Sequence, residues 1–143
     1  MMLRNVNPLL SPDILHMLSS MGHGHEVVIA DANFPGIDSG PRCVRADGVS
    51  ASDMLKAVLS VTPLDQYADE RAFCMETVED ASIIPDAVAE FQAIIRNEAE
   101  NAAPITGVER FAFYERAEKA FGVILTGELR LYGNIILKKG VIL

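Results

Sequence analysis

Residues 21–35 read MGHGHEVVIADANFP, and their pattern is the clearest signal of fold in the chain. The apolar run at 27–30 is continuous rather than alternating, and it is bounded by Glu26 and Asp31. A short continuous apolar run between polar residues is typical of a strand that is buried on both faces of a sheet. We therefore expect a central strand here, with helices packed on both sides of it.

Both ends of this predicted strand carry side chains suited to chemistry. Gly22 and Gly24 flank His23, and glycine lets a backbone adopt positive φ values and approach a ligand closely. Asp31 stands where the strand ends, and loops at strand ends are favoured ligand sites in α/β proteins. Histidine and aspartate supply acid, base and hydrogen-bonding groups near neutral pH. The alternatives are an exposed turn histidine and a carboxylate that caps a turn.

Helix and strand signals alternate along most of the 143 residues. Strands are expected at 27–30, 43–46, 73–78, 108–111, 121–127 and 132–141, and helices at 12–21, about 51–61, 85–100 and 113–120. Either Ser50 or Ser52 is the N-cap of the second helix. The alternation predicts an α/β fold, a three-layer α/β/α arrangement around a mixed, largely parallel sheet. Chain length predicts one domain over residues 1–143.

Composition limits the partners. The net charge of −8 argues against nucleic acid and anionic membranes as ligands. No window resembles an apolar membrane span, and the N-terminal residues lack the apolar run of a signal peptide. The two cysteines, Cys43 and Cys74, are expected to be buried free thiols of a cytoplasmic protein. Half of the residues are hydrophobic but only 6% are aromatic, which favours apolar surface covered by further copies of the chain.

Metal and nucleotide chemistry find little support in the sequence. His23 and His25 could be metal ligands beside Glu26 and Asp31, but the only other histidine, His16, lies on the first predicted helix. A metal site is therefore not predicted. The dinucleotide and phosphate-loop fingerprints are absent, as is the G-x-S-x-G motif of serine hydrolases.

Two later segments add polar groups that could bind a ligand. Arg110 lies between aromatic residues, and its planar donor fork suits a carboxylate or vicinal hydroxyls. The alternative is local ion pairing with Glu109 or Glu115. In the segment Tyr132-Gly133-Asn134, a phenol and an amide flank a glycine that allows close approach. The alternative there is a plain turn into the last strand.

Taken together, these motifs resemble the L-fucose mutarotase branch of the fucose mutarotase/ribose pyranase family. The resemblance runs in order from residue 8 to residue 141. Its motifs are MGHG at 21–24, IADANFP at 29–35, RADG at 45–48, ERFAFYERA at 109–117, KAF at 119–121, TGE at 126–128 and YGNIILKKGV at 132–141.

The resemblance implies a cytoplasmic isomerase that interconverts the α and β anomers of L-fucose without cofactor or metal. It implies a site at a subunit interface of a ring-shaped homo-oligomer, commonly a decamer. It assigns the catalytic role to His23 and substrate contacts to Asp31, Arg110, Tyr132, Gly133 and Asn134. His25 departs from the family pattern, which more often has aspartate there.

Our hypothesis is that His23 protonates the ring oxygen, while Asp31 holds either the imidazole or a sugar hydroxyl. Tyr114 and a bound water are both open as the group that deprotonates the anomeric hydroxyl. One alternative function is a D-ribose pyranase, although that branch usually has histidine where this chain has Arg110. Another is a non-catalytic monosaccharide-binding module, and a metal-dependent enzyme is a more distant third.

Overall fold

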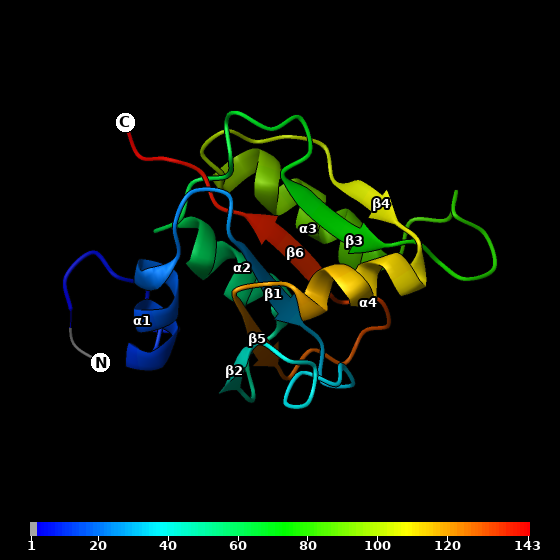
Figure 1. The fold of residues 1–143 in the computed structure, drawn as a ribbon, viewed down its shortest axis with the longest axis horizontal. Helices are drawn as coiled ribbons and strands as arrows, with labels where there is room; N and C mark the ends of the chain where they lie inside the picture. Colours follow the sequence, from blue (N-terminus) through cyan, green and yellow to red (C-terminus); the bar gives the residue numbers. More distant parts are fainter. Residues whose placement is uncertain (1–2) are drawn as a thin grey trace.

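The computed structural model describes residues 3–143, which fold around one six-stranded sheet in the order β2-β5-β1-β6-β3-β4 (Figure 1). The strands are β1 (Glu26–Ala30), β2 (Arg42–Ala46), β3 (Ala72–Met75), β4 (Thr106–Val108), β5 (Gly122–Thr126) and β6 (Ile135–Lys138). β6 is antiparallel to both of its neighbours, β1 and β3, and the other three pairings are parallel. The mixed, largely parallel sheet predicted from the sequence is confirmed.

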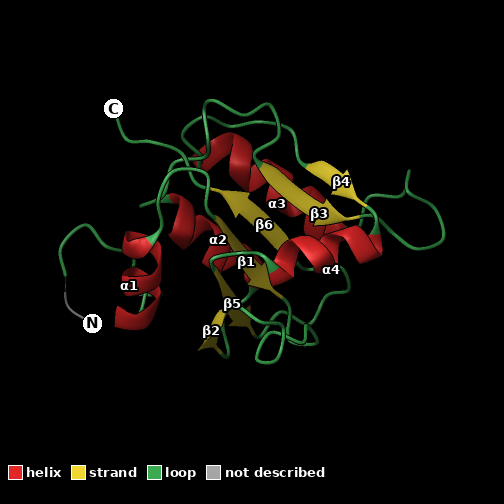
Figure 2. Cartoon of the chain, viewed as in Figure 1, coloured by secondary structure: helices red, strands yellow, loops and turns green. Residues whose placement is uncertain are grey.

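Helices cover both faces of this sheet, as predicted. They are α1 (Pro12–Ser20), α2 (Ala51–Leu59), α3 (Asp86–Glu98) and α4 (Arg110–Glu118). Val27 and Ile29 of β1 share a hydrophobic cluster with α1, α2 and α3, while Val28 and Ala30 point into the cluster under α4. Figure 2 shows α4 in front of the sheet and α2 and α3 behind it. These four apolar residues of β1, at 27–30, are fully buried, which confirms the prediction of a strand buried on both faces.

Serine side chains cap the starts of α1 and α2. Ser11 Oγ accepts a hydrogen bond from the amide of Ile14 at 3.3 Å, and Pro12 occupies the first turn of α1. Ser50 Oγ accepts from the amide of Asp53 at 3.1 Å, so Ser50 rather than Ser52 caps α2. Ser52 lies inside the helix and is free to serve another contact.

The strand predicted at 108–111 is wrong. β4 ends at Val108, and Arg110 is already the first residue of α4. The Glu109 carboxylate accepts from the amides of Phe111 and Ala112 at 3.0 and 3.1 Å, which satisfies donors that a helix start leaves unpaired. Two predicted strands are also shorter than expected, since β3 ends at Met75 and β6 begins only at Ile135.

The cysteines and the helix lengths agree with the composition. Cys43 and Cys74 are both free thiols, and they lie on β2 and β3, which are not neighbours in the sheet. Cys74 is buried as predicted, but Cys43 is only partly buried. Burial raises the pKa of both thiols. The longest helix, α3, has 13 residues, and among residues 3–143 no helix has the length and apolar character needed to cross a bilayer.

Candidate functional site

A cavity of about 300 Å³ opens at the edge of the sheet where β1 and β3 end. This is the edge at which the carboxyl ends of parallel strands meet, the usual place for ligands in open α/β sheets. Its volume lies at about the lower end of the range for small-molecule sites. It is lined by Asp31, Asn33, Phe34, Met75, Val78, Arg110, Tyr114, Leu131, Tyr132 and Asn134. Four of the six predicted site residues therefore meet in one pocket.

Asp31 and Asn134 are joined directly at the base of this pocket. The amide of Asp31 donates to Asn134 Oδ1 at 2.7 Å, and Asn134 Nδ2 donates to Asp31 Oδ2 at 3.1 Å. The other carboxylate oxygen, Oδ1, accepts from the amide of Asn33 at 3.0 Å. Burial raises the pKa of Asp31 above its ordinary value, and these hydrogen bonds partly offset that effect. Each carboxylate oxygen retains a lone pair that could accept from a ligand hydroxyl.

The segment that leads into β6 has an unusual backbone. Tyr132 has φ +58°, which is uncommon for a residue with a side chain. Its hydroxyl accepts from the amide of Val78 at 3.2 Å. A Cβ at Gly133 would lie 2.7 Å from Glu128 Cγ and 3.0 Å from the carbonyl oxygen of Arg130. Close packing beside the pocket therefore leaves no room for a side chain at position 133.

Arg110 is exposed at the start of α4. The two carboxylates proposed as its local partners are engaged elsewhere in the described chain: Glu109 caps the helix, and Glu115 pairs with Lys119 at 3.2 Å. The guanidinium of Arg110 is thus available to the pocket. Tyr114 lies one turn further along α4 and stacks on Phe34, with ring centroids 5.7 Å apart.

His23 lies at the opposite edge of the sheet. The five residues of β1 separate it from Asp31, a span of roughly 15 Å at the rise of an extended strand. Within one chain, Asp31 therefore does not contact the imidazole of His23. The two residues are close in sequence, but an extended strand places them far apart in space.

Asp65 is the partner that the imidazole has instead. Asp65 Oδ1 lies 3.0 Å from His23 Nε2, and the Asp65 side chain is only 4% exposed whereas that of His23 is 46% exposed. Burial tends to raise the pKa of Asp65, but hydrogen bonds from the Tyr67 amide and from His23 outweigh it, so the pKa lies below its ordinary value. Because an ionised carboxylate only accepts, His23 donates through Nε2 and leaves Nδ1 facing away from Asp65. The Tyr67 ring packs edge-on against the imidazole at 5.5 Å.

His25 has a structural contact of its own. Its Nδ1 accepts from the amide of Gly22 at 2.9 Å, and its ring stacks on Phe121 at 5.1 Å between centroids. This bond closes the turn around His23, where Gly24 takes φ +82°. Among residues 3–143 no three metal-ligating side chains are grouped together.

Comparison with known proteins identifies the family. A sequence profile of the RbsD / FucU transport protein family matches residues 4–142. The chain belongs to this family. Among solved structures of similar chains, the fucose mutarotase of Streptococcus pneumoniae in complex with L-fucose is 39% identical, with a TM-score of 0.91, over 99% of this chain and all of that one. FucU of Bifidobacterium longum is 40% identical, also with a TM-score of 0.91, over 98% and 100%.

A third similar solved structure is that of Atu2016, provisionally described as a sugar-binding protein. It is 41% identical to this chain, with a TM-score of 0.94, over 99% of this chain and 97% of that one. The resemblance that the motifs indicated is thereby confirmed along nearly the whole sequence.

Proposed function

We propose that this protein is an L-fucose mutarotase that acts in the cytoplasm. The observation that carries the proposal is the convergence of four polar side chains, Asp31, Arg110, Tyr132 and Asn134, on one small pocket from three separate parts of the chain. These groups offer both donors and acceptors, the combination that an array of sugar hydroxyls requires. Similarity to a mutarotase that binds L-fucose supports the choice of sugar.

The reaction needs only acid–base groups. The anomeric hydroxyl loses a proton, the bond between C1 and the ring oxygen breaks, and the ring oxygen gains a proton to give the open aldehyde. Rotation about the C1–C2 bond and closure on the other face of the carbonyl yield the second anomer. His23 is the proposed acid toward the ring oxygen: because Asp65 accepts from Nε2–H, the ring donates from Nδ1 when Nδ1 also carries a proton, and it takes a proton back at Nδ1 in the reverse direction. A positioned acid–base group contributes about 10²–10⁴-fold to such a reaction.

The proposed site is shared between two copies of the chain. His23 and the pocket occupy opposite edges of one sheet, so His23 of one copy would act on sugar held in the pocket of another. Apolar side chains beside the pocket give a second copy a surface to cover: Val78, Phe111 and Leu131 are 64%, 73% and 74% exposed. The family resemblance favours a ring-shaped assembly, commonly a decamer.

Saturation-transfer NMR on equilibrated L-fucose tests the proposal. Saturating H1 of one anomer should reduce the H1 signal of the other only when protein is present. His23→Ala should lower the exchange rate on saturating fucose by about 10²-fold or more. His16→Ala is the matched control, because His16 is an exposed histidine on α1. An unchanged rate in His23→Ala would remove His23 from the chemistry.

The same measurement separates the alternatives. Transfer on D-ribose but not on L-fucose would make the protein a pyranase. Binding of fucose without transfer would leave a sugar-binding module, the function provisionally given to Atu2016. Light scattering that finds a monomer at micromolar concentration would contradict the shared site.

A further inference from the structure

An ion pair between the partly exposed Arg130 and the buried Glu128 stands behind the segment that carries Tyr132, Gly133 and Asn134. Arg130 Nη2 donates to Glu128 Oε1 at 2.9 Å, and Arg130 Nε donates to Glu128 Oε2 at 3.2 Å, so the pair is bidentate. The Glu128 side chain is only 6% exposed. Hydrogen bonds from Arg130 hold the pKa of Glu128 below its ordinary value against the effect of burial. A paired, buried carboxylate of this kind is strongly fixed in place.

Glu128 contacts two segments beside the pocket, residue 32 through its backbone and Gly133 through its side chain. Its carbonyl oxygen accepts from the amide of Ala32, the residue after Asp31, at 2.9 Å. Its Cγ lies so close to Gly133 that a Cβ there would be 2.7 Å away. The position of Glu128 therefore sets the position of Gly133, and through it the neighbouring Tyr132 and Asn134.

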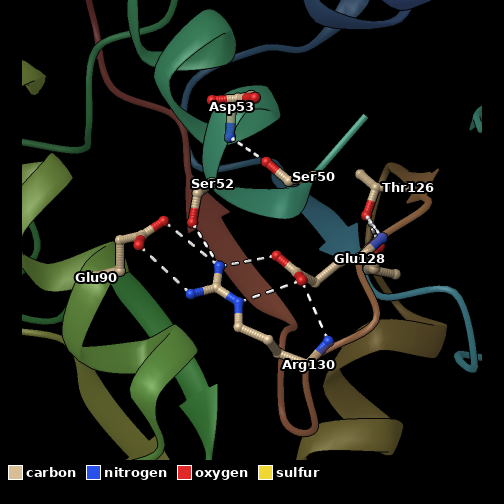
Figure 3. Close-up of polar contacts among 8 residues, drawn as sticks. Ser50, Ser52, Asp53, Glu90, Thr126, Glu128 and Arg130 are labelled. Carbon is tan, nitrogen blue, oxygen red and sulfur yellow. Dashed lines mark hydrogen bonds and ion pairs between the residues drawn. The ribbon is translucent and has the colours of Figure 1, made fainter. Parts of the chain in front are cut away.

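Arg130 connects this segment to the helices on the far face of the sheet. Figure 3 shows its guanidinium between the carboxylates of Glu128 and Glu90, with the hydroxyl of Ser52 beside them. Arg130 Nη2 donates to Ser52 Oγ at 2.9 Å, and the guanidinium reaches Glu90 of α3 at 3.4 Å. Ser52 is on α2, so the network anchors a pocket segment to two helices that do not line the pocket. Glu90 is half exposed, so its share of the network is screened by water.

We propose that Glu128 and Arg130 are positioning residues for sugar binding, which hold the segment Tyr132–Asn134 in its strained shape against α2 and α3. This inference rests on the proposed function, since it concerns the same pocket. Neither residue lines the cavity. Their loss should weaken sugar binding while leaving the proton transfer by His23 largely intact.

The test compares Arg130→Ala with Lys56→Ala. Lys56 also ties α2 to α3, through Glu98 at 3.6 Å, but it does not reach the pocket segment. The exchange rate is measured against L-fucose concentration. Arg130→Ala should raise the half-saturation concentration about tenfold and change the maximal rate less than about threefold, as expected when binding contacts are displaced. Glu90→Gln is a milder change at the exposed end of the network, and it should raise the half-saturation concentration by a smaller factor.

Hydrogen exchange without sugar supplies a readout independent of activity. Amides of residues 128–134 should exchange faster in Arg130→Ala than in wild type, and Lys56→Ala should leave them unchanged. Arg130→Lys keeps the positive charge but lacks the planar donor fork, so its affinity for L-fucose should lie between those of Arg130→Ala and wild type. Equal effects of Arg130→Ala and Lys56→Ala, or an unchanged half-saturation in both Arg130→Ala and Glu90→Gln, would overturn the proposal. If wild type exchanges no sugar, the proposed function fails, and hydrogen exchange alone still decides whether the pair fixes the segment.

Discussion

Asp65 contacts the imidazole of His23 at Nε2, on the side of the ring away from Nδ1. The carboxylate is buried and receives hydrogen bonds from His23 Nε2 and from the Tyr67 amide, both at 3.0 Å. This arrangement selects the tautomer with the proton on Nε2 and restricts rotation of the ring. Such orientation matters because proton transfer depends on geometry before it depends on pKa.

The first prediction concerns the pH dependence of this pair. The pKa of Asp65 is lower in the folded state than its ordinary value of about 3.9. Its ionised form therefore stabilises the fold above that pH, and this contribution is lost as pH falls through the folded pKa. We expect Asp65→Asn to lose about 1–3 kcal/mol of unfolding free energy near pH 6, the range for a hydrogen bond to a charged group.

Urea denaturation at fixed protein concentration measures the loss of unfolding free energy expected for Asp65→Asn. The difference between wild type and Asp65→Asn should shrink as pH falls through the folded-state pKa of Asp65, which lies below its ordinary value. Asp47→Asn is the control, because Asp47 pairs with Arg45 on the exposed surface and should change stability little at either pH. A difference that stays constant as pH falls from 6 until the carboxylates of the protein are protonated would mean that ionised Asp65 does not stabilise the fold.

Nothing in the sequence pointed to Asp65 as the partner of His23. The two residues are 42 positions apart, and Asp65 follows a helix break rather than a recognisable motif. Sequence patterns report on local periodicity and capping, whereas this contact depends on how the chain after α2 packs beside the turn before β1. Glu128 and Arg130 were missed for a similar reason, since their partners lie on α2 and α3.

At the level of elements, α4 is the helix that brings Arg110 and Tyr114 to the pocket. It is fixed to the sheet by Arg116, whose Nε and Nη2 donate to Glu26 of β1 at 2.8 and 2.7 Å. The guanidinium also lies 3.6 Å from the centre of the Phe73 ring on β3. One side chain thus joins α4 to two strands of the sheet.

We predict that Arg116→Met lowers the unfolding free energy by about 1.5–3 kcal/mol, because it leaves the largely buried Glu26 carboxylate unpaired. Methionine keeps the length and apolar contact of the side chain, so the change isolates the charge. Lys119→Ala removes an exposed pair on the same helix, Lys119 with Glu115, and should cost at most about 0.5 kcal/mol. Urea denaturation of both variants checks the prediction, and equal losses would contradict it.

The boundary of α4 shows where sequence patterns misled. The sequence predicted a strand at 108–111 and a helix only from Phe113, whereas α4 begins at Arg110. The deciding signal was Glu109, whose carboxylate caps the helix, a role more often filled by Ser, Thr, Asp or Asn. Where capping followed those common preferences, the sequence predicted the start of α1 at Ser11 and narrowed the start of α2 to Ser50 or Ser52, of which Ser50 is the cap.

At the scale of the whole molecule, the predicted central strand already implied that His23 and Asp31 of one chain lie far apart. An extended strand of five residues cannot bring its two ends together, so either the two residues serve different sites or a site is completed by another copy. Sequence similarity along the whole chain could indicate which residues matter. It could not indicate which copy each residue comes from, because copies of one chain share one sequence.

The last prediction uses complementation between two inactive variants. His23→Ala lacks the proposed acid, and Arg110→Ala lacks an exposed pocket residue whose loss leaves the core intact. Each variant alone should exchange fucose poorly. If each site takes His23 from one copy and the pocket from another, random co-assembly at equal amounts makes about a quarter of the sites intact. Saturation transfer on the co-assembled protein measures the recovered rate.

A second mixture makes the outcome unambiguous. Wild type co-assembled with the double variant His23→Ala/Arg110→Ala should also retain about a quarter of the wild-type rate if sites are shared, but about half if each chain carries a whole site. In the unshared case, the two single variants would recover nothing. Since the pocket and His23 lie at opposite edges of the sheet, we expect equal recovery in both mixtures. Unequal recovery in the two mixtures, with mixed assemblies verified by mass spectrometry, would mean that a single chain carries the whole site. His23 would then have no contact with the sugar in the pocket.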